Sequence, residues 1–120
     1  MSYDIYLKDP NTWDTIELPE KHDVKGGTFA VGGTTKAWIN VTYNYAARFE
    51  HAFSNDKGVR SIYGLTAAQS IPILEAAMSR LGDDTHPDYW EPTEGNAKEA
   101  LRGLLELARL APPDSVWKGD

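Results

Sequence analysis

Apolar and polar residues follow two different spacings along this chain. Residues 3–7 alternate with a period of two, which predicts a first strand with its apolar side chains on one face. Residues 15–18, 28–31 and 35–41 are short apolar or β-branched stretches near glycine or proline, and they predict three further strands. The first third of the chain is therefore expected to form a small β-sheet.

The spacing becomes helical after residue 44. Tyr45, Phe49 and Phe53 recur every four residues, so one stripe of a helix carries aromatic rings that are expected to face the core. Residues 54–58 supply turn-forming side chains that end this helix. The stretch that follows, residues 59–64, is predicted to be a short extended connector.

Two further helices are marked by their ends. Thr66 and Gln69 match a capping box, which satisfies main-chain N–H groups at the start of a helix that Gly82 stops. Thr93 is expected to cap a last helix, which the prolines at residues 112–113 terminate. This order predicts an α+β class: a small antiparallel N-terminal sheet packed against about three C-terminal helices, in one domain spanning residues 1–120.

The composition narrows the classes of function. The chain has no cysteine, which removes disulfides, thiolate metal sites and a cysteine nucleophile. Its formal net charge is −6 and its 12 basic residues are scattered, so a long nucleic acid is not expected as a partner. No apolar run approaches ~20 residues and no signal region is visible, which predicts no membrane partner and a cytoplasmic location.

The densest group of chemistry-bearing side chains follows a glycine-rich segment. Glycine pairs at residues 26–27 and 32–33 precede residues 38–49, which combine aromatic rings, amides and hydroxyls. The glycine pairs suit two tight hairpin turns, and they would also let bare main chain approach a ligand. Tyr and Trp join a stackable ring to a hydrogen-bonding tip, which suits a nucleobase or a protein surface.

These side chains define a candidate site for a small nucleotide-type molecule. The expected ligand-binding residues are Trp38, Tyr43, Asn44, Arg48, Arg60 and Tyr63. A tryptophan or tyrosine ring would stack on the base, the amide would read its edge, and an arginine would hold phosphate. A structural role for the same residues is the competing interpretation, because large aromatic side chains are often buried.

An acidic loop between the second and third predicted helices is the candidate protein interface. Its expected interface residues are Asp83, Asp84, Asp88 and Trp90. The loop lacks the alternation and glycine of a calcium-binding loop, so solvated carboxylates are favoured over a bound cation. The three histidines are dispersed and share no metal-ligand spacing, and neither a metal nor a cofactor is expected.

Five segments carry a resemblance to a known group of proteins. They are residues 26–28, 38–45, 60–64, 89–97 and 117–120. With these segments the chain resembles, over almost its full length, small and largely uncharacterised proteins carried by phages and prophages of bacteria. The resemblance implies a phage context inside a bacterial host cell, and it marks Asn44 and Gly95 as candidates. It brings no catalytic residues.

The leading hypothesis is a non-enzymatic, anti-defence binding protein that sequesters a nucleotide-type signal without turning it over. Two chains can enclose a ligand that one cannot, so a homo-oligomer is one expectation. The alternative is an acidic inhibitor that covers a bacterial defence protein through the loop around Asp84 and Trp90. A third hypothesis is a small nucleotide-acting enzyme with His51 or His86 as general base.

Overall fold

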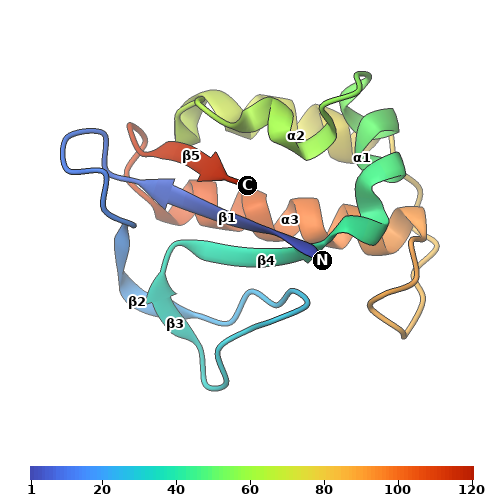
Figure 1. Cartoon of the computed structure of the whole chain (residues 1–120), viewed down its shortest axis with the longest axis horizontal. Helices are drawn as coiled ribbons and strands as arrows, with labels where there is room; N and C mark the ends of the chain where they lie inside the picture. Colours follow the sequence, from blue (N-terminus) through green and yellow to red (C-terminus); the bar gives the residue numbers. More distant parts are fainter.

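The computed structural model describes residues 1–120 and contains a three-stranded sheet, a two-stranded ribbon and three α-helices (Figure 1). The strands are β1 (Ser2–Lys8), β2 (Glu17–His22), β3 (Thr34–Lys36), β4 (Trp38–Thr42) and β5 (Val116–Gly119). The α-helices are α1 (Ala46–Phe53), α2 (Ala67–Ser79) and α3 (Glu94–Leu110), and two 3-10 helices are η1 (Tyr43–Tyr45) and η2 (Gly58–Ile62). The predicted α+β class, with an antiparallel sheet and three helices, is confirmed.

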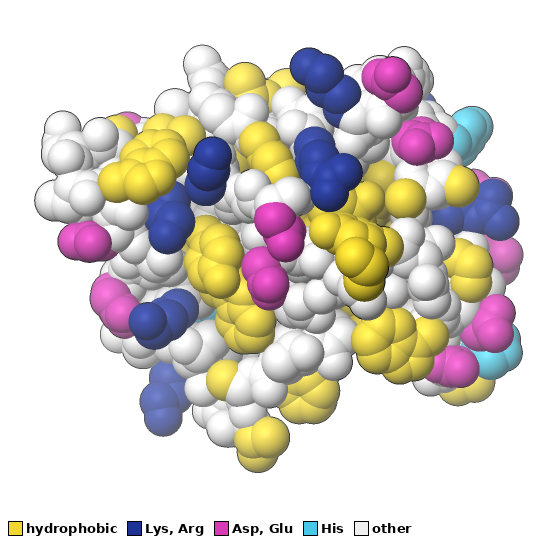
Figure 2. Space-filling model, viewed as in Figure 1, with side chains coloured by type: hydrophobic (Ala, Val, Ile, Leu, Met, Phe, Trp, Pro, Cys, Tyr) yellow, Lys and Arg dark blue, Asp and Glu magenta, His cyan; other side chains and the backbone are white.

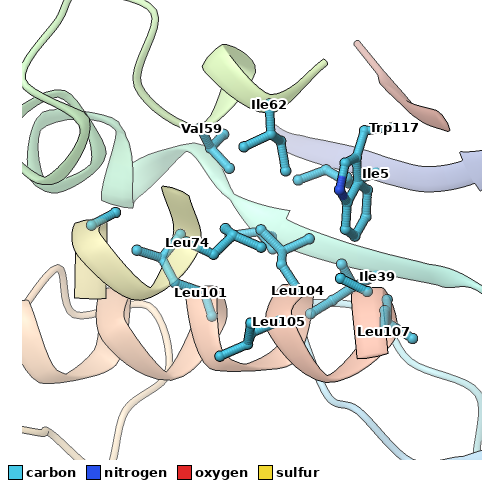
Figure 3. Close-up of a cluster of buried hydrophobic side chains, with 14 of the residues drawn as sticks. Ile5, Ile39, Val59, Ile62, Leu74, Leu101, Leu104, Leu105, Leu107 and Trp117 are labelled. Carbon is cyan, nitrogen blue, oxygen red and sulfur yellow. The ribbon is translucent and has the colours of Figure 1, made fainter. Parts of the chain in front are cut away.

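Strand β1 is the centre of the main sheet, which has the order β4-β1-β5 with both pairs antiparallel. Its alternation places Ile5 and Leu7 on the face that packs against the helices, where both are fully buried. Ile5 pairs with Ile39 of β4, and Leu7 pairs with Trp117 of β5. Figure 3 shows Ile5, Ile39 and Trp117 gathered with leucines of α2 and α3. One cluster of 27 buried apolar residues fills this space.

The helices begin where their caps were predicted. The Thr66 hydroxyl accepts from the main-chain N–H of Gln69, and the Gln69 side chain accepts in return from Thr66, so the capping box of α2 is confirmed. Thr93 caps α3 by accepting from the N–H of Asn96. The predicted aromatic stripe also faces inward: Tyr45 of η1 and Phe49 and Phe53 of α1 are all buried.

Three local predictions were wrong. Residues 28–31 form a loop rather than a strand. Residues 58–62 form η2 instead of extended chain, because the Asn55 carboxamide oxygen accepts from the N–H groups of Lys57 and Gly58 and starts a turn. The second strand was predicted at residues 15–18, but β2 spans Glu17–His22 and includes Pro19. Proline is tolerated there because β2 pairs only with β3, so one of its edges needs no donor.

The two glycine pairs behave differently. Gly32 and Gly33 both have positive φ angles, +85° and +89°, and form a turn before β3, as predicted. Gly26 and Gly27 make no hairpin turn; they run along the outer edge of β4, where Gly27 N–H donates to the main-chain oxygen of Asn40 at 3.1 Å. A Cβ atom at Gly26 would clash with that oxygen. Glycine is therefore required there for packing against a strand.

Both edges of the main sheet are closed, and only one of its faces is covered. The loop at residues 26–28 covers the edge of β4, while Gly64 and Leu65 exchange main-chain hydrogen bonds with Trp117 at the edge of β5. The helices cover the face that carries Ile5 and Leu7, so the opposite face is open (Figure 1). None of the helices combines the length and apolarity that crossing a bilayer requires.

Candidate functional site

The six predicted ligand-binding residues lie in three separate places. Trp38 lies on the open face of the sheet, where its indole N–H donates to Asp4 Oδ1 at 3.2 Å. Asn44 and Arg48 lie at the start of α1 and contact the loop before α3. Tyr43, Arg60 and Tyr63 lie together beside β1 and β5. The structure therefore does not bring the six into one site.

Asn44 and Arg48 hold a loop in place. The Asn44 amide donates to the main-chain oxygen of Trp90 at 2.9 Å, and Arg48 Nε donates to that of Pro92 at 2.9 Å. These contacts use the groups that were expected to read a base edge and hold phosphate. The arrangement supports a structural role for both residues.

Tyr43, Arg60 and Tyr63 pack against other side chains instead of lining a space. The guanidinium carbon of Arg60 lies 5.0 Å from the ring centre of Tyr3 and 5.7 Å from that of Tyr43. Its Nε donates to the main-chain oxygen of Asp120 at 2.8 Å. None of the four cavities in the molecule is lined by Tyr43, Arg60 or Tyr63. This cluster fastens the end of β5 to η2.

The Tyr63 hydroxyl in this cluster is buried and has no hydrogen-bond partner. It lies over Gly119, where a side chain would collide with it. Burial raises the pKa of Tyr63 well above its ordinary value, and the nearby Asp120 adds to the effect. The hydroxyl is therefore neutral across the physiological range.

The four predicted interface residues lie together in the loop between α2 and α3, and all are exposed. Lys98 donates to Asp83 at 2.7 Å, and this hydrogen bond holds the pKa of Asp83 below its usual range. Asp88 accepts from the N–H of Trp90 at 3.0 Å, and the Trp90 side chain is 49% exposed. Asp84 is exposed and forms no ion pair.

Asn96 is the residue that fixes this loop, and it was not predicted. Its Oδ1 accepts from the N–H of His86 at 3.0 Å, while its Nδ2 donates to the main-chain oxygens of Asp88 and Glu91, both at 3.0 Å. The side chain is buried. A sequence signal did exist, because an amide three residues after the Thr93 cap can reach back across the loop.

The largest cavity is a groove of about 550 Å³ between residues 23–25, residues 86–89 and α3. The polar groups on its floor bond one another: the Tyr45 hydroxyl donates to the main-chain oxygen of Tyr89, and the Tyr89 hydroxyl accepts from the N–H of Thr42. Asn96, also on the floor, makes the three bonds described above. A ligand in this groove would therefore meet polar groups on the floor that already have hydrogen-bond partners. Charged side chains would contact it only from the more exposed parts of the wall.

His86 lines the same groove, but it does not form a catalytic arrangement. Its Nδ1 accepts from the main-chain N–H of Asp88 at 2.9 Å, which removes that nitrogen as a general base. His51 lies on α1 and lines no cavity. No group of three or more His, Asp or Glu side chains is placed to hold a metal ion.

A different cavity, of about 430 Å³, lies on the open face of the sheet; we call it the sheet-face cavity. It is lined by Asp4, Tyr6, Lys8, Trp13, Lys118, Gly119 and Asp120. Figure 2 shows this side of the molecule, where apolar side chains alternate with basic and acidic ones over the strands. Aromatic rings, ammonium groups and carboxylates therefore meet in one depression.

The strand alternation of β1 builds the floor of this cavity. Asp4, Tyr6 and Lys8 point away from the helices because Ile5 and Leu7 point toward them. Tyr6 pairs with Lys118 of β5, so these two side chains stand side by side. Burial raises the pKa of Tyr6, and the carboxylates of Asp4 and Asp120 raise it further. The phenol is therefore a neutral hydrogen-bonding group.

The two lysines of the cavity form no ion pair, although Asp4 and Asp120 line the same cavity. The chain forms three ion pairs, and none of them includes Lys8 or Lys118. Lys8 Nζ lies 4.8 Å from the centre of the Tyr6 ring and donates to the Thr15 hydroxyl at 3.0 Å. The ammonium group of Lys118 donates no hydrogen bond within the chain, and its side chain is exposed. Both ammonium groups can meet an anion.

Trp13 forms one wall of the cavity in an unfavourable main-chain conformation. Its φ angle is +62°, in the left-handed region that large side chains rarely adopt, and its side chain is 49% exposed. A tight turn imposes this conformation, because Trp13 N–H donates to Asp9 O and Asp9 N–H donates to Asp14 O, both at 2.8 Å. Strain that holds an exposed aromatic ring over a cavity is typical of binding sites.

Comparison of the chain with protein-family models, with curated proteins and with solved structures found no match. The candidate site is therefore defined by its own geometry. The sequence analysis named Trp38, which lies on this face without lining the cavity, but it missed Tyr6, Lys8, Trp13 and Lys118. The alternation of residues 3–7 already separated Tyr6 from the core positions, and that signal could have found it.

Proposed function

We propose that this chain is a non-enzymatic protein that binds a small nucleotide-type molecule in the sheet-face cavity. One observation carries the proposal: the cavity of about 430 Å³ joins aromatic rings to two lysines that have no acidic partner. A base would stack on Trp13, and phosphate oxygens would accept from Lys8 and Lys118. Trp38 supports the site indirectly by fixing Asp4.

The resemblance to phage and prophage proteins gives this binding a biological purpose. A protein that holds a nucleotide signal without converting it lowers the free concentration of that signal, which is how an anti-defence sponge would act. The cavity contains no histidine or arranged acid and base pair, and this supports holding over turnover. We therefore propose a phage origin and a sponge role together with nucleotide binding.

A second candidate function is docking of a bacterial defence protein on the loop of residues 83–92. The supporting observation is Trp90, which is 49% exposed although four internal hydrogen bonds from Asn44, Arg48 and Asn96 fix the loop around it. An exposed tryptophan on a fixed segment is typical of a protein-binding hot spot. Binding that weakens steeply with added salt would favour this candidate, because the nearby carboxylates are exposed.

A thermal-shift screen against mononucleotides, cyclic dinucleotides and ADP-ribose tests the first candidate. A ligand at about 100 times its dissociation constant stabilises the fold by about 2.7 kcal/mol, or roughly 10 °C for a chain of this length. The ligand should be recovered unchanged. A screen without any shift would reject nucleotide binding and leave the docking of a protein partner as the better candidate.

Two variants test whether the ligand binds in the sheet-face cavity. Trp13→Gly removes the stacking ring and also relieves the positive φ angle, so binding should be lost while the melting temperature stays equal or rises. Lys118→Ala should weaken phosphate binding about tenfold, with Lys57→Ala as a matched exposed control that lines no cavity. If Trp90→Ala abolished nucleotide binding and Trp13→Gly did not, the proposed site would be wrong.

A further inference from the structure

The charges of the sheet-face cavity are separated along the strands. Asp4 and Asp120 lie at one end, Tyr6 and Lys118 in the middle, and Lys8 at the other end. Asp4 and Lys8 are four residues apart on β1, which corresponds to about 13 Å of extended strand. A molecule that fits this cavity therefore meets acceptors at one end and ammonium groups toward the other.

Hydrogen bonds hold the carboxylates at the acceptor end, and each keeps one oxygen that accepts no hydrogen bond from the chain. Asp4 Oδ1 accepts from Trp38 Nε1 at 3.2 Å and from Asn40 Nδ2 at 3.0 Å. Asp120 Oδ1 accepts from the main-chain N–H of Asp4 at 2.9 Å. Neither carboxylate is in an ion pair, and the second oxygen of each accepts no hydrogen bond from the chain.

Asp120 is held from two sides. In addition to the hydrogen bond of its carboxylate, its main-chain oxygen accepts from Arg60 Nε at 2.8 Å. The guanidinium of Arg60 is in turn packed on the rings of Tyr3 and Tyr43. This chain of contacts gives Arg60 and Tyr43 a positioning role at the cavity, in place of the direct ligand contact predicted for them.

We infer that Asp4 and Asp120 together bind the 2′,3′-diol of a ribose, so that the ligand is a ribonucleotide rather than a deoxyribonucleotide. This inference rests on the proposed nucleotide-binding function of the same cavity. The two carboxylates belong to neighbouring residues, since Asp120 Oδ1 accepts from the main-chain N–H of Asp4, and together they offer acceptors to two adjacent hydroxyl donors. Hydrogen bonds to a charged acceptor are stronger than neutral ones. In dinucleotide-binding proteins a single carboxylate accepts from a ribose hydroxyl, which is the same donor and acceptor chemistry. The lysines then take the 5′-phosphate.

Isothermal titration calorimetry on the full chain tests this inference with three matched ligand forms. The probes are the ribo, 2′-deoxy and 2′,3′-dideoxy forms of the 5′-monophosphates of adenosine, guanosine, cytidine and uridine. We expect one or more ribo forms to bind, and the matching dideoxy form to bind at least about tenfold more weakly. Equal affinity for the ribo and dideoxy forms would overturn the diol inference and leave nucleotide binding intact.

The Asp120→Asn variant tests recognition of the ribose diol separately from nucleotide binding. Asparagine keeps Oδ1 for the N–H of Asp4 but removes the charge, so the preference for the ribo form should fall to within about threefold while binding itself persists. Asp56→Asn, at an exposed position outside every cavity, should keep the full preference. If no monophosphate binds in any form, both the diol inference and mononucleotide binding in this cavity fail. Retention of the ribo preference in Asp120→Asn would refute the assigned role of that carboxylate.

Discussion

Replacing Asn96 by aspartate exchanges one terminal group at a buried position and reverses its hydrogen-bonding role. In the native chain Nδ2 of Asn96 donates to the main-chain oxygens of Asp88 and Glu91, both at 3.0 Å. An aspartate keeps the oxygen that accepts from His86 but turns a second oxygen toward these two carbonyls. Donation is therefore replaced by repulsion between oxygens inside the fold.

The cost can be worked out from these contacts. Two lost hydrogen bonds remove about 1 kcal/mol each, and burial of the second carboxylate oxygen, which has no donor, costs about 1 kcal/mol or more in addition. The free energy of unfolding should therefore fall by about 3 kcal/mol or more at pH 7, and the melting temperature by roughly 12 °C. That loss is a large part of the ~5–15 kcal/mol that stabilises a typical domain.

The loss should depend on pH with a definite sign. Burial raises the pKa of the introduced carboxyl in the folded state above its unfolded value of about 3.9. Below the unfolded pKa the group is protonated in both states and can donate to one carbonyl, so most of the destabilisation disappears. The penalty grows as pH rises through the folded-state pKa. Urea denaturation of Asn96→Asp and the native chain at pH 4 and pH 7 measures this difference.

Asn44→Asp is the matched control, because Asn44 also donates to a carbonyl of the same loop. Its Nδ2 lies 2.9 Å from the main-chain oxygen of Trp90, but at an exposed position where water can replace the lost bond. The control should lose less than about 1 kcal/mol. Equal losses in the two variants, or a loss below about 1 kcal/mol for Asn96→Asp, would refute the argument that burial sets the cost.

Three further predictions concern the aromatic side chains. Tyr63→Phe removes a buried hydroxyl without a partner and should raise the free energy of unfolding by about 1 kcal/mol, or roughly 4 °C by calorimetry; a fall would mean that the hydroxyl has a bound water. Trp117→Phe breaks a 2.8 Å bond to the Ser70 hydroxyl and leaves a void, so urea denaturation should show a loss of about 2–3 kcal/mol, and a loss below ~1 kcal/mol would contradict the packing. Burial is the main cause that raises the pKa of five tyrosines: Tyr3, Tyr6, Tyr45, Tyr63 and Tyr89. The contribution of these neutral phenols to the free energy of unfolding is therefore complete below pH ~10 and is lost as pH rises further. Absorption at 295 nm during an alkaline titration should rise together with unfolding; early, independent ionisation of these phenols would contradict it.

The helices were predictable because local signals agree with the tertiary structure. The apolar spacing of α3 selects the face that is buried, and Thr93 marks its start by local hydrogen bonding alone. Strand β1 was predictable for the same reason, since its alternation matches a sheet with one covered face. In these elements a short stretch of sequence is enough to predict both the type of secondary structure and the buried face.

Strand β5 carries no comparable local signal. It has four residues, including a lysine and a glycine, and its place depends on partners far away in the sequence. On one side Trp117 of β5 pairs with Leu7 of β1, and on the other side its main-chain N–H donates to the main-chain oxygen of Leu65. Residues 28–31 give the reverse case, because their strand-like composition finds no partner strand. Pairing over long separations decided both outcomes.

The predicted binding residues failed as a set for a related reason. Six residues were predicted to form one site, and of these Tyr43, Arg60 and Tyr63 do lie together. Spacing carries no information on whether such groups leave a space between them, and here the rings and the guanidinium contact one another. The cavity opens on the other side of β1, where side chains of residues 4–13 meet those of residues 118–120.

Trp13 is the residue for which a structural explanation is weakest. A buried tryptophan contributes to stability through apolar area, but half of this side chain remains in water. A residue at φ +62° would be less strained as glycine, so the turn itself gives no reason for a tryptophan. The remaining property of Trp13 is that its ring borders a cavity with two unpaired ammonium groups. A strained, exposed ring beside this cavity supports the proposal that Trp13 stacks on a bound ligand.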